Sequence, residues 1–138
     1  MRCFEMQDWV TIRGASSASQ ATTIQSEHQW LDLAKYSDVV LWTEIKEATL
    51  GSGTVDISFE TAPSKDESLF SQAVAPFLAT AGTVTASVVH RDTATVPLGR
   101  WLRWKITSGA GTAWDVVFRV WVAAAGGGGG DRGAASGG

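Results

Sequence analysis

The chain has 138 residues, of which 44% are hydrophobic and 18% charged, and its formal net charge is −3. This length suits a single domain with one core, and no apolar run approaches the roughly 20 residues that a membrane-spanning helix needs. Because the eleven lysines and arginines are scattered singly, the sequence lacks the clustered basic face typical of nucleic-acid or membrane-surface binding. We therefore expect a soluble protein that binds neither.

Cys3 is the only cysteine, so no disulfide can form within the chain and packing must hold the fold together. The first ten residues contain no uninterrupted apolar segment and no small-residue cleavage site, both of which a secretory signal would need. We therefore expect synthesis in the cytosol.

The first strand signal covers residues 9–13 and ends at Gly14. A polar segment rich in serine, threonine and alanine follows at residues 15–23, and its composition predicts an extended loop. Ile24 and residues 30–33 predict short strands or a turn. Helical periodicity is missing from the whole sequence, which favours an all-β protein.

The clearest strand pattern lies in the middle of the sequence. Residues 38–46 alternate between an apolar and a mixed face, and residues 54–60 repeat the alternation after a turn at residues 51–53. The predicted inward residues are Val39, Leu41, Ile45, Val55, Ile57 and Phe59, and the predicted outward residues of the first run are Val40, Trp42, Glu44 and Lys46. Two alternating runs joined by a glycine turn are typical of an antiparallel hairpin, so we predict that these strands pair.

Residues 62–68 are polar and include Pro63, which predicts a surface loop. Pro76 interrupts the apolar segment 69–78, so we expect this segment to cross one end of the sandwich and to place Phe70 or Phe77 in the core. The β-branched residues of segment 83–90 predict another strand.

Two further runs, residues 100–106 and 114–122, alternate in the same way on either side of a glycine-containing turn. They predict a second antiparallel hairpin. The inward residues are Leu102, Trp104, Ile106, Trp114, Val116, Phe118, Val120 and Val122, and the outward ones are Trp101, Arg103, Lys105, Asp115, Val117, Arg119 and Trp121.

The whole pattern predicts an all-β antiparallel sandwich that is jelly-roll-like, with an extended N-terminal segment and a glycine-rich C-terminal tail. We divide the chain into an N-terminal strand and polar segment at residues 1–23, a sandwich at 24–122 and an arm at 123–138. The arm consists mostly of glycine and alanine. We expect a neighbouring protein chain to hold it in an assembly.

The sequence contains no recognisable nucleophile, phosphate-binding or metal-binding motif, so we predict no catalytic residues, no metal and no cofactor. His28 and His90 are expected on the surface, and Asp66 with Glu67 is expected to be solvated rather than to bind calcium. An enzyme with an unfamiliar site would have to use a pair such as His90 with Asp92.

Seven tryptophans are more than one small core needs. Trp104 and Trp114 are predicted to be core residues, whereas Trp42, Trp101 and Trp121 are predicted on the outward side, together with Val40 and Val117. Such an exposed apolar patch would be typical of a contact surface. Two alternatives remain open: the N-terminal segment or residues 69–78 cover the patch, or the indole rings stack on sugars, although the chain has no asparagine to orient sugar hydroxyls.

The segments WLDL (30–33), DVVLWTEI (38–45), FETAP (59–63) and PLGRWLRW (97–104) resemble small β-sandwich virion proteins of tailed phages and prophages. The resemblance covers residues 24–122. It implies a non-catalytic structural protein, made in the host cytoplasm and built into the head or tail of the virion. Our first hypothesis is a capsid decoration or cement protein, because terminal arms can staple adjacent capsomers.

The partners expected for this role are other copies of the chain and a major capsid protein or another virion protein. The predicted partner-binding residues are Val40, Trp42, Trp101, Val117, Trp121, Gly126, Gly130 and Arg132. The alternative function is a carbohydrate-binding sandwich module on a tail or cell-surface protein.

Overall fold

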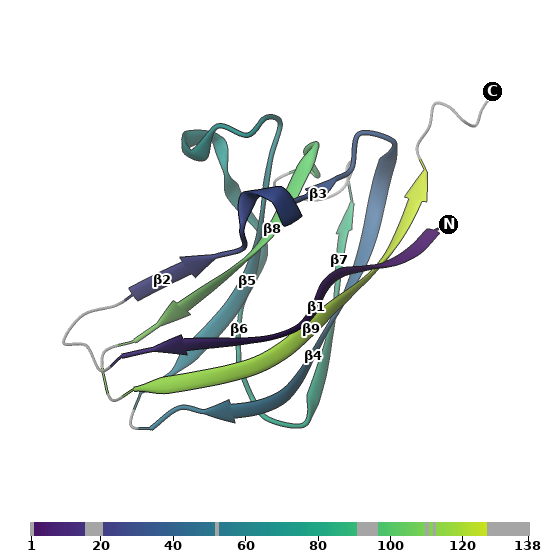
Figure 1. Ribbon diagram of the computed structural model, residues 1–138. Coiled ribbons are helices and arrows are strands. Elements are labelled where there is room, and N and C mark those ends of the chain that lie inside the picture. Colours follow the sequence, from purple (N-terminus) through teal and green to yellow (C-terminus); the bar gives the residue numbers. More distant parts are fainter. Residues whose placement is uncertain are drawn as a thin grey trace.

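The computed structural model describes residues 2–15, 21–51, 53–90, 97–109, 111 and 113–126. Within these residues the chain forms nine strands and two single-turn 3-10 helices (Figure 1). In chain order they are β1 (Arg2–Gly14), β2 (Ala21–Ile24), η1 (Glu27–Gln29), β3 (Leu31–Asp32), β4 (Tyr36–Thr49), β5 (Val55–Ala62), η2 (Glu67–Leu69), β6 (Ser71–Leu78), β7 (Thr83–His90), β8 (Trp101–Ser108) and β9 (Trp114–Gly126).

The strands form two antiparallel sheets that face each other. Sheet I has the order β1-β9-β4-β7, and sheet II has the order β2-β8-β5-β6, with β3 also paired to β8. Apart from β3, the pairing is nested: β1 pairs with β9, β2 with β8, β4 with β7 and β5 with β6. This is the pairing of a jelly roll. The structure therefore confirms the predicted all-β jelly-roll-like sandwich.

Both predicted hairpins are wrong. β4 pairs with β7 and β9 in sheet I, whereas β5 pairs with β6 and β8 in sheet II. Likewise β8 belongs to sheet II and β9 to sheet I. The reason is that alternation identifies the buried face of a strand but not the strand that supplies its hydrogen bonds. A short turn, here containing Gly51 at φ 59°, can equally well carry the chain across the core to the facing sheet.

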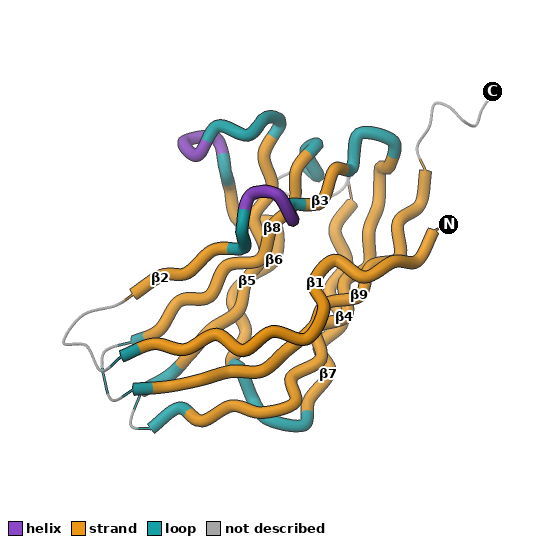
Figure 2. The backbone as a smooth tube through the Cα atoms, in the orientation of Figure 1, coloured by secondary structure: helices purple, strands orange, loops and turns teal. Residues whose placement is uncertain are grey.

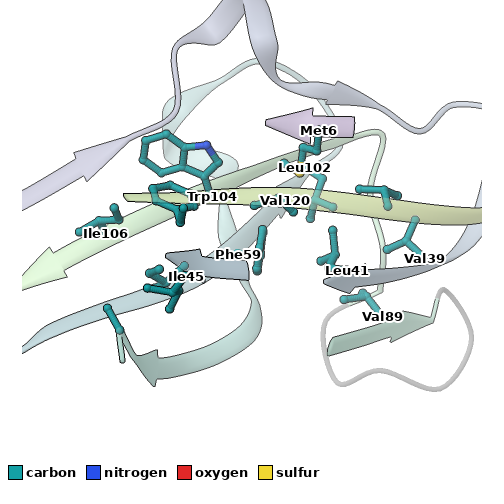
Figure 3. Close-up of a cluster of buried hydrophobic side chains, with 14 of the residues drawn as sticks. Met6, Val39, Leu41, Ile45, Phe59, Val89, Leu102, Trp104, Ile106 and Val120 are labelled. Atoms are coloured by element: carbon teal, nitrogen blue, oxygen red, sulfur yellow. The ribbon is translucent and has the colours of Figure 1, made fainter. Parts of the chain in front are cut away.

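The inward residues predicted for the four alternating runs are all buried and form one core between the sheets (Figure 3). Trp104 of sheet II packs edge-on against Phe118 of sheet I, with ring centres 5.2 Å apart. The Trp104 Nε1–H also donates to Oε1 of the buried Gln7 of β1 at 3.0 Å. Trp104 therefore joins the two sheets by packing and by a hydrogen bond.

The segment expected to cross the end of the sandwich instead forms β6, an edge strand that pairs with β5. An edge strand tolerates Pro76 because one side of the strand has no neighbour that needs its N–H groups. Phe77 packs against the core as expected. Phe70 does not plug the core but lies on the outer side of sheet II, where it packs against Trp30 with ring centres 4.9 Å apart.

β1 is an edge strand of sheet I and pairs with β9. The start of β1 lies beside the end of β9, since Arg2 is opposite Ala124 (Figure 1). Ala123 and Ala124, which the sequence assigned to the arm, are buried within β9. Figure 2 shows η1 and η2 at the same end of the sandwich, with η1 next to β3.

Two buried threonines provide a test of how polar groups are accommodated in this sandwich. Thr43 Oγ1 lies in the core without a hydrogen-bond partner, whereas Thr61 Oγ1 donates to Trp101 O at 2.9 Å and accepts from Gly99 N at 2.8 Å. Thr43→Val should raise the free energy of unfolding by about 1 kcal/mol, because it removes an unsatisfied hydroxyl of nearly equal size.

The matched control Thr61→Val should lower the free energy of unfolding by about 1–3 kcal/mol, because it leaves the Gly99 N–H without its acceptor. Urea unfolding of both variants measures the two effects. A loss of stability in Thr43→Val would contradict the assignment of Thr43 as unsatisfied.

Candidate functional site

The outer side of sheet I carries a patch of large side chains that face solvent, which we call the tryptophan face. It is formed by outward residues from all four strands. They are Trp9 of β1, Val40, Trp42 and Glu44 of β4, Val84, Ala86 and Val88 of β7, and Val117, Arg119 and Trp121 of β9.

Trp42 and Trp121 occupy the middle of the tryptophan face. They are directly opposite each other on β4 and β9, an arrangement that brings side chains into contact range, and they are 38% and 39% exposed. Within the described residues, neither segment considered as a cover lies over these rings. The N-terminal segment forms β1, the neighbouring edge strand of the same sheet, and residues 71–78 belong to sheet II. The rings therefore remain open to a partner.

Arg119 contacts two of the indole rings on this surface and an acidic residue on the adjacent strand. Its Nε donates to Glu44 Oε1 at 2.8 Å, on the adjacent strand. Its guanidinium carbon lies 4.6 Å from the ring centre of Trp9 and 5.7 Å from that of Trp121. An arginine between two indoles makes favourable cation–π contacts and restricts the motion of both rings.

Beside Trp9 the tryptophan face is hollowed by a shallow cavity of about 360 Å³. Its polar lining comes from Glu44, Lys46 and Thr83, and Val84 adds an apolar wall. Lys46 Nζ lies 5.8 Å from the centre of the Trp9 ring. The face is therefore flat and apolar around Trp42 and becomes concave and charged around Trp9.

The outer side of sheet II, in contrast, is closed by the protein's own chain. Arg103 was predicted to point outward, and it does, yet it is only 2% exposed. Its guanidinium binds Glu60 through Nε and Nη2 at 2.9 and 2.7 Å, and Glu67 of η2 through Nη1 and Nη2 at 2.8 and 2.6 Å.

Two aromatic rings complete the enclosure of Arg103. Its guanidinium carbon lies 3.7 Å from the ring centre of Phe70 and 5.0 Å from that of Trp30. Burial by itself lowers the pKa of Arg103, but the hydrogen bonds that Arg103 donates to Glu67 and Glu60, together with their negative charges, outweigh this and raise it. The hydrogen bond from Arg103 holds the pKa of Glu67 below its ordinary value of 4.5. Glu67 is exposed, as expected, but it also binds a buried cation, which the sequence did not indicate.

The structure does not bring Trp101 together with Trp42 and Trp121. Trp101 begins β8 in sheet II, on the opposite side of the sandwich, and is partly covered by Lys65 Nζ at 4.4 Å and the Arg100 guanidinium at 5.1 Å from its ring centre. The other outward residues predicted as partner-binding, Val40 and Val117, do lie on the tryptophan face. Trp101 is an outward residue of an alternating strand like these residues, but its strand belongs to sheet II and theirs belong to sheet I.

The remaining predicted residues lie near the end of β9. Gly126 is the last residue of that strand and pairs with Tyr36. Gly130 and Arg132 are outside the described residues. A second hollow, of about 490 Å³, is lined by Arg2, Phe4 and Leu31 together with Asp32, Lys35 and Tyr36.

The titratable residues considered for chemistry are dispersed. His90 Nδ1 lies 3.1 Å from Asp38 Oδ1 at an exposed position, His28 is exposed in η1, and Asp92 is outside the described residues. Cys3 is exposed. Within the described residues no three His, Cys, Asp or Glu side chains are grouped as a metal site requires, and no helix is long and apolar enough to cross a bilayer.

Comparison with known proteins identifies the fold. No family model and no curated protein matches the chain. Among solved structures, the chain is similar to viral capsid sandwiches. A chain in the structure of the infectious bursal disease virus Gx strain has a TM-score of 0.51 at 13% identity, over 92% of this chain and 32% of that one. A chain of the infectious bursal disease virus VP2 subviral particle has a TM-score of 0.51 at 9% identity, over 88% and 32%.

This protein therefore spans about a third of the length of those viral chains. At such low identity the likeness concerns the arrangement of strands, which is the jelly roll described above. It transfers no binding residue from those chains to this one.

Sequence reasoning missed several members of the tryptophan face. Arg119 was predicted to point outward and Trp9 was placed in a strand, but neither was included in the patch, because the sequence pattern does not show that β1 lies beside β9. Val84 and Val88 were also missed, although they alternate with Thr83, Thr85 and Ser87. That alternation in β7 was the available signal for an exposed apolar side.

Two arginines in equivalent outward positions should differ sharply in their contribution to stability. Arg103→Leu should lower the free energy of unfolding by about 3–5 kcal/mol, because it leaves the buried carboxylate of Glu60 without its main partner. Arg119→Leu should cost less than about 1 kcal/mol, because its ion pair with Glu44 is partly solvated. Equal losses in urea unfolding would contradict the enclosure of Arg103.

The acid dependence of stability should reveal the contact between Glu67 and Arg103. A lowered pKa in the folded state means that the charged form adds stability above pH 4.5 and that this contribution is lost as the pH falls through the folded-state pKa. The difference in unfolding free energy between the native protein and Glu67→Gln should therefore shrink below pH 4.5. A difference that stays constant from neutral to acidic pH would rule out this role of Glu67.

Proposed function

We propose that this protein is a structural component of a virion and that it binds a capsid or other virion protein through the tryptophan face. The most specific form of the proposal is a phage head decoration or cement protein. The observation that carries it is the exposed Trp42–Trp121 pair at the centre of the tryptophan face.

The composition of the tryptophan face supports binding to another protein. Tryptophan and arginine are the residue types that most often dominate the energy of protein interfaces, and valines here surround them. Arg119 fixes the indoles of Trp9 and Trp121 before any partner arrives. Such preorganisation reduces the side-chain entropy that binding would otherwise cost.

The fold supports the same class of role. A jelly roll is a rigid scaffold that occurs in viral capsid proteins, and two of the solved structures similar to this chain come from a virus. Because one fold serves many functions, this likeness adds weight only in combination with the exposed face. The resemblance of segments 30–33, 38–45, 59–63 and 97–104 to phage virion proteins points in the same direction.

The glycine-rich segment that follows Gly126 has a place in this proposal as an arm toward an adjacent capsid subunit. Gly126 leaves sheet I between the starts of β1 and β4, at the end of the sandwich that holds Arg2 and Tyr36. An arm from this point would add contacts beyond the tryptophan face and raise the overall affinity through a second attachment.

Sugar binding is a weaker interpretation of the same surface. A pyranose ring needs a free indole face and neighbouring groups that orient its hydroxyls, yet the Trp9 ring is already stacked on Arg119. Trp42 lies opposite Ala86 on β7, Arg119 already contacts Trp121, and the chain has no asparagine.

The decisive experiment measures binding of the full chain to emptied capsids of the encoding phage from which small accessory proteins have been removed. Trp42→Ala and Trp121→Ala should each weaken binding by about tenfold or more. Trp101→Ala is the matched control, because it removes an outward tryptophan from the opposite sheet and should leave binding unchanged. Cosedimentation with the capsids gives the bound fraction.

The proposal would be overturned if the native protein does not bind these capsids. It would also be overturned if Trp101→Ala weakens binding as much as the other two substitutions. A glycan array with tryptophan fluorescence provides the competing outcome. Saturable quenching by a sugar that disappears in Trp42→Ala would replace the virion role with the carbohydrate-binding one.

A further inference from the structure

Among the described residues the two sheets have five edge strands, β1, β2, β3, β6 and β7, and β3 is only two residues long. Three of the others carry features that block pairing with another strand. β1 has two register irregularities and the charged residues Arg2, Glu5, Asp8 and Arg13. β6 contains Pro76 and also has two irregularities against β5. β2 is only four residues long. Bulges, charges, proline and short length are the known protections of sheet edges.

β7 has none of these protections. It pairs with β4 over eight consecutive positions, from Asp38–His90 to Ile45–Thr83, without any irregularity. Its sequence TVTASVVH contains no lysine, arginine, aspartate, glutamate or proline. Val84 and Val88 are 62% and 54% exposed on its outward side. Among the strands of the described residues, β4 is its one partner within sheet I.

We propose that β7 pairs in antiparallel fashion with β7 of a second copy of this chain, so that two sheets I become one continuous sheet. Pairing would satisfy the backbone N–H and C=O groups that this edge presents to solvent. A second copy is the fitting occupant because an uncharged strand meets no like-charge repulsion when it lies against itself, whereas charged residues opposite each other would oppose the pairing.

The outward side chains also fit this arrangement. Val84, Ala86 and Val88 are small, and Val88 adjoins Val40 while Ala86 adjoins Trp42 on β4. A twofold axis perpendicular to the sheet would keep the outward sides of both copies on the same surface. The two tryptophan faces would then merge into one apolar surface, with the valines of both β7 strands along its centre line.

Symmetry makes a sharp geometric prediction. Directly opposite residues in an antiparallel pair point to the same side of the sheet, so the sum of their residue numbers must be even in this dimer. One residue of β7 must therefore lie opposite its own copy. Its Cα atoms would be about 4.5–5.5 Å apart, within the range that a disulfide bridges.

This inference depends on the β7 edge and not on the virion role. The first test is a cysteine scan of β7, positions 83 to 90, in a Cys3→Ser background, because Cys3 is exposed and would form its own cross-links. Mild oxidation should give a disulfide-linked dimer most efficiently at a single position, with the yield falling away from it. Uniformly low yields along the whole strand would overturn the proposal.

The second test compares two lysine substitutions by sedimentation equilibrium of the full chain. Ala86→Lys, at the middle of the β7 edge, should weaken self-association by about tenfold or more, because it brings like charges close together across the pair. Thr11→Lys is the control, since Thr11 is exposed on β1, the opposite edge of the same sheet. It should leave self-association unchanged. Circular dichroism verifies that both variants are folded.

The outcomes separate this inference from the proposed function. A protein that is monomeric, or whose dimer is unaffected by Ala86→Lys, overturns β7 pairing even if it binds depleted capsids. A dimer that is sensitive to Ala86→Lys supports β7 pairing even if the capsids do not bind it.

Discussion

The pairing of β9 between β1 and β4 is the contact on which most of this structure depends. It joins the last described strand to the first and to the middle of the chain, and it does so along thirteen residues. The inward side of β9 supplies Phe118 and Val120 to the core. The outward side of the same strand supplies Arg119 and Trp121. A single strand therefore links the stability of the sandwich to the composition of its exposed surface.

The two outer sides of the sandwich show that similar sequence patterns can end up in very different environments. Arg103 and Arg119 both follow an alternating apolar pattern and both point away from the core. Arg103 is enclosed by η2, Trp30 and Phe70, and its charge is balanced by two glutamates. Arg119 has one glutamate and two indoles on an open surface. Within the described residues, the protein's own η2 and the aromatic rings beside it cover Arg103 on sheet II, whereas the outer side of sheet I stays exposed to solvent.

Because of this asymmetry, the two sides of the molecule offer different surfaces to a partner. A partner that approaches sheet II meets a surface already packed by the chain itself, where Trp101 is partly covered by cations. A partner that approaches sheet I meets exposed rings held in fixed positions, bordered by the β7 edge. Contacts through a face and through an edge are compatible with each other, because they use different groups: side chains in one case and backbone in the other. The virion role that we propose could therefore use both.

The sequence by itself determined the all-β class and, for the four alternating runs, which side of each strand is buried. Val39, Leu41, Phe59, Trp104 and Phe118 could be placed in the core because the period of two is a local property of an extended chain. Only the tertiary structure decided how the strands are divided between the sheets. That division separates Trp101 from Trp42 and brings Trp121 and Trp9 to the same surface. It depends on pairings between residues far apart in the chain, and a short turn is equally consistent with a hairpin and with a crossing between sheets. The local pattern is the same in both cases, so nothing in it distinguishes a residue that its own loops will cover, such as Arg103, from one that stays exposed.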